Sequence, residues 1–153
     1  MVDSRDKGAR AELKVRDELR KLTLHKWERT PSSGALSAVH MMKGDLYIPG
    51  VANIYCVEVK HYAEDQLTSK ILTTTVKSTF DLWWEQTIRE SHETNRKPLL
   101  IFKHDRGKLM CAVDDIITPP NKLPVRYFLI GHLNVWVLKL EDFINYCKPN
   151  FVL

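Results

Sequence analysis

Residues 44–60 read GDLYIPGVANIYCVEVK, and this short segment sets the architecture expected of the chain. Two runs rich in β-branched and aromatic residues flank the turn pair Pro49-Gly50. Such runs on either side of a chain-breaking pair predict a hairpin, with strands over residues 45–48 and 54–60. The rest of the fold is expected to assemble around this hairpin.

The second strand of the hairpin carries charges among apolar residues. Alternation places Glu58 and Lys60 on one face, roughly 6–7 Å apart. If Ile48 pairs with Tyr55, Asp45 lies directly opposite Glu58, where two carboxylates repel each other. A divalent cation between them would make that arrangement favourable. The alternative is a surface ion pair between Glu58 and Lys60 on a half-exposed strand.

Upstream of the hairpin, residues 7–22 predict an amphipathic helix. Val15, Leu19 and Leu22 form one apolar stripe at helical spacing. Glu12 falls on this stripe or at its edge. Its carboxylate is therefore directed toward the interior, or it reaches water at the rim of the buried face.

Downstream, strands and helices continue to mix. Ser78 is the expected N-cap of the next helix, with Asp81 three positions later. The remaining elements are expected as a helix to about residue 91, strands over 98–102, 109–113, 127–130 and 135–138, and a short helix over 141–147. This order predicts an α/β fold with a mixed central β-sheet flanked by helices, in a single domain over residues 1–153.

Composition narrows the class of protein. The 153 residues are 44% hydrophobic and 27% charged, which excludes a disordered or low-complexity chain. No apolar run is long enough to span a membrane, and the N-terminus lacks an apolar signal core, so we expect a cytoplasmic protein. The net charge of +4 is concentrated in the first 30 residues, with nine basic against six acidic residues. That excess suits a polyanionic partner, or it is an ordinary solvated helix face.

Three cysteines lie far apart, in no metal-binding spacing. We expect reduced thiols and no structural zinc site. The chain shows no sign of an organic cofactor.

The charged positions carry a family resemblance. Gly44-Asp45 followed by Glu58-Val59-Lys60 resembles the PD-(D/E)XK nuclease signature, with Gly44 in place of the usual proline. A fuller similarity is to Hjc-type Holliday junction resolvases, in four ordered blocks at Lys7–Glu12, Arg29–Ala35, Gly44–Leu46 and Glu58–Lys60. The resemblance covers about residues 7–104. It implies a restriction-endonuclease-like core in a phage or prokaryotic protein.

The resemblance also implies a metal site. Asp45, Glu58 and the backbone carbonyl of Val59 would hold Mg²⁺, with Mn²⁺ as a substitute. Glu12 would ligate a second ion or a metal-bound water, giving two ions per site. Lys60 would orient or activate the attacking water, and the product would carry a 5′-phosphate.

Further residues match family positions that contact DNA. Ser33 would act at the scissile phosphate as a catalytic-loop residue, or it is an ordinary turn serine. Lys7, Arg10 and Arg29 would contact backbone phosphates. Gln86 matches a family residue on the later helix and would help to position the site.

The function implied is a structure-selective endonuclease that resolves four-way DNA junctions. Two nicks on a two-fold symmetric junction imply a homodimer. Trp83 and Trp84 are expected in the core or at a dimer interface rather than as base-stacking platforms. In a homodimer, these tryptophans and the apolar residues 151–153 would be partly buried between the subunits. The alternatives are another nuclease of the superfamily that cuts duplex, flap or nicked DNA, and a non-catalytic DNA-binding subunit.

Overall fold

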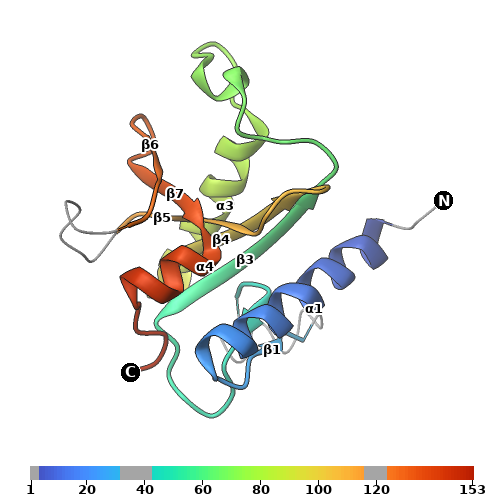
Figure 1. Ribbon diagram of the computed structural model, residues 1–153, viewed down its shortest axis with the longest axis vertical. Coiled ribbons are helices and arrows are strands. Elements are labelled where there is room, and N and C mark those ends of the chain that lie inside the picture. The colour runs from blue at the N-terminus through green and yellow to red at the C-terminus, as the bar shows by residue number, and fades with distance from the viewer. Residues whose placement is uncertain (1–3, 32–42, 116–123) are drawn as a thin grey trace.

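The computed structural model describes residues 4–31, 43–115 and 124–153, and across these residues the chain forms one seven-stranded mixed sheet (Figure 1). The strands are β1 (Glu28–Arg29), β2 (Leu46–Tyr47), β3 (Tyr55–Tyr62), β4 (Lys97–His104), β5 (Met110–Val113), β6 (Phe128–Ile130) and β7 (Val135–Lys139). The helical elements are α1 (Ser4–Thr23), the 3₁₀ turn η1 (Ser69–Leu72), α3 (Thr79–Glu93), α4 (Leu140–Asp142) and the π-helical turn η2 (Phe143–Cys147). The predicted α/β class with a mixed sheet is confirmed.

The sheet has the order β1-β2-β3-β4-β5-β7-β6. β3 and β4 pair in parallel, and the other neighbouring strands pair antiparallel. A parallel pair needs a crossover connection, and α3 supplies it between β3 and β4. The two longest strands therefore lie side by side at the centre of the sheet.

Helix α1 covers one face of the sheet and runs alongside β3 (Figure 1). Its apolar stripe buries Ala11, Val15 and Leu19 in a core cluster that includes Val57 and Val59 of β3. The amphipathic helix expected from the spacing is thus present, extended at both ends. Burial of this stripe anchors α1 beside the charged segment of β3.

Helix α3 covers the opposite face. It begins with the predicted cap, in which the Ser78 hydroxyl accepts the Asp81 N–H and the Asp81 carboxylate accepts the Ser78 N–H. Trp83 and Trp84 are only 5% and 4% exposed, and both lie in the core cluster on this face. The core alternative is correct for both tryptophans, and their assignment to a dimer surface is wrong.

The C-terminal segment also packs into the chain itself. Phe151 is buried, and its ring contacts Trp27 and Tyr55 at centroid distances of 5.2 and 5.5 Å. Leu153 is exposed. The prediction that Phe151 contributes to a dimer surface is therefore wrong, because its ring already fills a hydrophobic site between distant parts of the chain.

Two further observations concern the ends of the central strands and the search for membrane-spanning helices. Parallel pairing carries β3 and β4 two residues beyond their predicted ends, to Tyr62 and His104. Among the residues that the structure describes, no helix combines the length and apolarity needed to cross a bilayer.

Candidate active site

The backbone before β2 fixes the position of Asp45. Gly44 has a φ of +85°, and a Cβ added there would lie 2.8 Å from the carbonyl oxygen of Val57. Glycine meets both demands, whereas proline is locked at negative φ. This explains why Gly44 stands where the family usually has proline. The Asp45 N–H then donates to the same Val57 oxygen at 2.7 Å.

The pairing of β2 with β3 brings two carboxyl groups together. Leu46 pairs with Val57, which is the predicted register and sets Asp45 opposite Glu58. The Asp45 Oδ2 accepts the Val59 N–H at 2.7 Å. Glu58 is only 3% exposed, so the alternative of a surface ion pair on a half-exposed strand is wrong.

Burial makes the charged form of Glu58 unfavourable. The pKa of Glu58 is raised to about 11, mainly by burial and to a smaller extent by a hydrogen bond with the Glu90 carboxyl and by the nearby Asp45, while Lys60 acts in the opposite direction. A bound cation would favour the ionised carboxylate instead.

The pKa of Asp45 is also raised, and burial is again the main cause. Burial raises the pKa of Asp45 to about 6, against the lowering effect of the Val59 N–H. The charge of Glu12 contributes to this rise, and Lys60 acts against it. Glu12 from α1 and Lys60 from β3 therefore lie close enough to Asp45 to affect its ionisation.

Glu12 is held by a basic residue from β1. The Arg29 Nε donates to Glu12 Oε2 at 2.8 Å, and the Glu12 side chain is 21% exposed. β1 places Arg29 beside Leu46 of β2, which brings the guanidinium to the edge of the site. Arg29, predicted to contact DNA phosphates, thus also orients a carboxylate of the site.

Helix α3 adds residues from the other side of Glu58. The Gln86 Nε2 donates to Glu58 Oε2 over a long 3.5 Å. Glu90 lies one turn later, and carboxylate oxygens of Glu58 and Glu90 and the Sγ of Cys56 lie within 4.8 Å of one another. Sequence reasoning missed Glu90, although its spacing of four residues from Gln86 places both on one helix face.

The other predicted residues have different positions. Lys7 lies on α1 near Asp105, whose pKa its charge helps to lower. Arg10 is exposed on the same helix. Ser33 lies outside the described residues.

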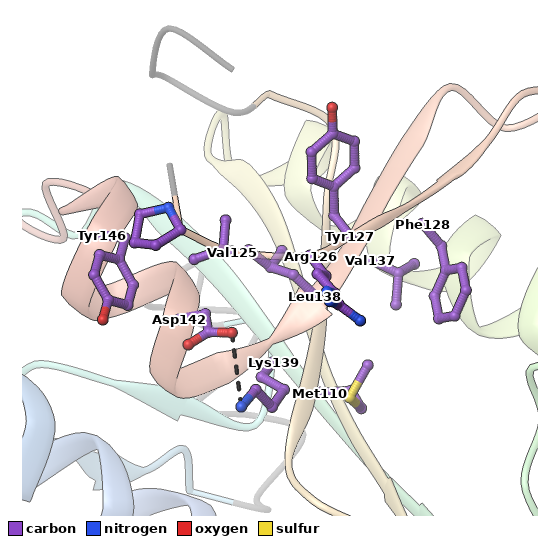
Figure 2. Close-up of a pocket in the computed structure, with 11 residues that line it drawn as sticks. Met110, Val125, Arg126, Tyr127, Phe128, Val137, Leu138, Lys139, Asp142 and Tyr146 are labelled. Atoms are coloured by element: carbon purple, nitrogen blue, oxygen red, sulfur yellow. Dashed lines mark ion pairs between the residues drawn. The ribbon is translucent and has the colours of Figure 1, made fainter. Parts of the chain in front are cut away.

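A hollow of about 910 Å³ lies elsewhere, between β6, β7 and η2 (Figure 2). Its walls include Tyr127, Phe128 and Tyr146. Its acidic residue Asp142 is paired with Lys139 at 3.8 Å. The residues that line this hollow therefore include no facing pair of carboxylates, and it is not the candidate site.

Comparison with known proteins now gives the family. A family model described as "Phage putative PDDEXK endonuclease" matches residues 3–152. The chain belongs to this family. The match confirms the PD-(D/E)XK resemblance and assigns the chain to the endonucleases.

One curated protein and one solved structure are reported as similar to this phage PDDEXK endonuclease. Protein D14 of Escherichia phage T5 is 47% identical over 116 residues, which are 74% of this chain and 72% of that protein. The solved structure of Archaeoglobus fulgidus Hjc, a Holliday junction resolvase, aligns with a TM-score of 0.44 and 15% identity. That alignment covers 89% of this chain and 91% of the Hjc chain.

PD-(D/E)XK nucleases generally use divalent metals, and the residues of this endonuclease fit such an ion. Asp45 and Glu58 provide hard carboxylate oxygens, the ligands that Mg²⁺ prefers. Their raised pKa values reflect burial together with a neighbouring negative charge, that of Asp45 for Glu58 and that of Glu12 for Asp45, which a cation would offset. Burial raises the pKa of the Cys56 thiol to about 12, so this neighbour is a protonated thiol at neutral pH and a poor ligand.

Proposed function

We propose that this endonuclease resolves four-way DNA junctions by paired, Mg²⁺-dependent phosphodiester hydrolysis. The proposal depends above all on the buried Glu58 and the half-buried Asp45 opposite it, with Lys60 and Glu12 close enough to affect the ionisation of Asp45. This combination is suited to binding a cation next to a phosphate. The four ordered sequence blocks shared with Hjc-type resolvases support the junction as substrate.

Each side chain has a distinct role in the proposed reaction. Asp45, Glu58 and the Val59 carbonyl would hold Mg²⁺, or Mn²⁺ in its place. The metal supplies neutralisation of phosphate charge and a more acidic water. Lys60 would orient that water and stabilise the anionic transition state. Glu12, oriented by Arg29, would serve a second ion or its water.

Positioning groups would surround these residues. Gln86 restrains the Glu58 carboxylate from α3. Lys7 and Arg10 would contact DNA phosphates, and Ser33 would contact the scissile phosphate. Because a junction has approximate two-fold symmetry, the two nicks would come from the two active sites of a homodimer.

The substrate is tested by direct comparison of DNA structures. The protein is incubated with a synthetic four-way junction, a linear duplex and a flap, each with Mg²⁺ or with EDTA. We expect symmetric paired nicks with 5′-phosphate ends in the junction alone, and no cleavage in EDTA. Cleavage of the duplex or flap would assign the enzyme to another branch of the superfamily, and binding without cleavage would make it a DNA-binding subunit.

The role of Asp45 is tested by one substitution. Asp45→Asn should reduce junction cleavage by at least about 100-fold, because losing a metal ligand is more severe than losing a supporting group. Junction binding in EDTA should be unchanged, since the carboxylate serves the metal rather than the phosphates. Asp17→Asn, an exposed α1 position paired with Arg16, is the matched control. A loss of binding equal to the loss of cleavage would contradict the assignment.

A further inference from the structure

The turn between β4 and β5 presents unusual positive charge beside the candidate site. Residues 103–108 read KHDRGK. Arg106 and Lys108 are exposed, and Lys103 is partly exposed. Within the described part of the chain, none of these three cations forms an ion pair with a carboxylate. The acid of the turn, Asp105, is engaged by a histidine instead.

Several contacts fix the shape of this turn. The Asp105 Oδ1 and the His61 Nε2 are 2.8 Å apart, and the Asp105 N–H donates to the Ala63 carbonyl at 3.3 Å. The Gly107 N–H donates to the His104 carbonyl at 3.0 Å. A Cβ on Gly107 would lie 2.6 Å from the His104 ring, so the ring packs directly on the glycine. These contacts attach the turn to the end of β3 and fix the backbone that carries Lys103, Arg106 and Lys108.

The strand register gives the distance between the turn and the carboxylates of the candidate site. Lys103 pairs with His61 in the parallel register. His61 is three residues beyond Glu58, which is about 10 Å along a strand. This separation is short enough for neighbouring phosphates of one DNA strand to reach both the turn and the candidate site.

Helix α1 extends the same surface. Its N-terminal end lies at the end of the molecule where β3 and β4 finish (Figure 1). The hydrogen bond with His61 lowers the pKa of Asp105, and the charges of Lys7 and Lys103 contribute to this effect, which places both lysines near the turn. Lys7 was expected to contact DNA from the sequence, whereas the turn was not.

We propose that residues 103–108, together with Lys7, form a phosphate-binding surface that holds the DNA backbone close to the cleaved bond. We call it the 103–108 surface. Its ligand is the sugar-phosphate backbone of DNA, read through charge rather than base sequence. The inference rests on the proposed nuclease function and adds a second point of attachment for the substrate.

The test neutralises two charges without disturbing the turn. Arg106 has a φ of +64°, a conformation that asparagine tolerates well, so the variant is Lys103→Gln combined with Arg106→Asn. Binding of the four-way junction is measured in EDTA across a series of salt concentrations. The slope of log K against log salt should become shallower by about 1.8, and affinity at 0.1 M salt should fall at least roughly tenfold.

Matched variants separate this surface from a general charge effect. Lys21→Gln with Lys26→Gln removes the same charge at the opposite end of α1 and should leave the slope nearly unchanged. Arg106→Lys keeps the charge and should retain the wild-type slope. Arg106→Asn alone, checked by circular dichroism and thermal unfolding, should lower the slope by about 0.9.

The outcomes distinguish this inference from the proposed function. If the wild-type protein binds and cuts the junction, but the double variant keeps the wild-type slope, the inference is wrong and the nuclease assignment stands. Equal losses in the control at the other end of α1 would also overturn it. A wild-type protein that neither binds nor cuts DNA would instead overturn the proposed function, and with it the 103–108 surface.

Discussion

At the scale of single residues, the backbone of Gly44 determines whether Asp45 can face Glu58. Gly44→Ala places a Cβ 2.8 Å from the Val57 carbonyl at a φ of +85°. We expect destabilisation of roughly 1–3 kcal/mol and a matching loss of cleavage. Gly44→Pro, which restores the residue usual in the family, should be more damaging because proline cannot adopt this φ. Chemical unfolding and junction cleavage measure the two effects.

Gly50 offers a matched control for this prediction. It also has a positive φ, of +77°, but a Cβ there would meet no atom within 4 Å. Gly50→Ala should therefore show the backbone strain alone and keep full cleavage. Wild-type cleavage by Gly44→Pro would contradict the described geometry.

The buried Glu58 should make metal-free stability depend on pH. Its pKa is 4.5 in the unfolded reference and about 11 in the folded protein, so the folded state binds one more proton between these values. The free energy of unfolding should therefore fall as pH rises from about 5 to 7, by about 1.4 kcal/mol per unit for each proton. Asp45 adds to this slope below pH 6. Denaturant unfolding in EDTA at several pH values measures it.

Glu58→Gln removes the titrating group. This variant should be inactive, more stable than wild type at pH 7 in EDTA, and much less sensitive to pH. Glu64→Gln, at an exposed position, should preserve both the slope and the activity. An unchanged slope in Glu58→Gln would show that other groups dominate the pH dependence.

Part of the site follows from the sequence at this scale. Strand alternation and hairpin register are local, so the pairing of Asp45 with Glu58 could be predicted. Glu90 could not, because its contact with Glu58 depends on how α3 packs across the sheet. The ion pair of Glu12 with Arg29 likewise joins two elements whose relative position is tertiary.

At the scale of elements, α3 depends on a charged cap that also ties down a distant turn. The Asp81 carboxylate accepts the Ser78 N–H at 2.8 Å and lies 2.9 Å from the Nε2 of His132. Burial raises the pKa of Asp81, but the hydrogen bonds with His132 and Ser78 outweigh it, and the net pKa is lowered. The resulting stabilisation is present above the ordinary pKa of 3.8 and is lost as pH falls through the folded value.

Asp81→Ala should lower the free energy of unfolding by about 1–3 kcal/mol at pH 7, since it removes the cap and leaves polar partners unpaired. The difference from wild type should shrink at pH 3, because the stabilisation by the Asp81 carboxylate is lost as the pH falls below its ordinary pKa of 3.8 and through its lowered folded value. Denaturant unfolding at both pH values measures the change. Glu85→Ala, which removes only the exposed pair with Lys77, should have an effect below about 1 kcal/mol. A difference for Asp81→Ala that does not vary with pH would point to packing alone.

The ends of the helices and strands show which features of the fold could not be predicted from local sequence patterns. Ser78 and Asp81 identified the start of α3 correctly, because a cap involves neighbours in sequence. The ends of β3 and β4 were predicted too short, since the polar residues there pair with one another across a parallel ladder. The helix expected over residues 141–147 is divided into α4 and the π-helical η2.

At the scale of the whole molecule, Phe151 joins segments from both halves of the chain. Its ring packs on Trp27 and Tyr55, and the neighbouring Ile54 N–H donates to the Phe151 carbonyl at 2.9 Å. Phe151→Ala should reduce the free energy of unfolding by about 3–5 kcal/mol, the range for truncating a buried aromatic residue. Denaturant unfolding measures this, together with the oligomeric state by light scattering.

Leu153→Ala is the control, because that side chain is 92% exposed and should matter by less than about 0.5 kcal/mol. If Phe151→Ala dissociated a dimer while leaving the stability of the monomer intact, the internal packing role would be contradicted.

The parallel pairing of β3 with β4 has a consequence for synthesis. Glu58 pairs with Leu100, about 40 residues later, and this partner becomes available only after α3 has been made. The chain must lose conformational entropy to close this long loop before the contacts between β3 and β4 can stabilise it. This order of events slows the pairing step of folding. A nascent chain that has emerged only as far as the first hairpin therefore holds both carboxylates without the neighbouring strand that buries them. Nuclease activity is therefore expected only after β4 has been synthesised and has paired with β3.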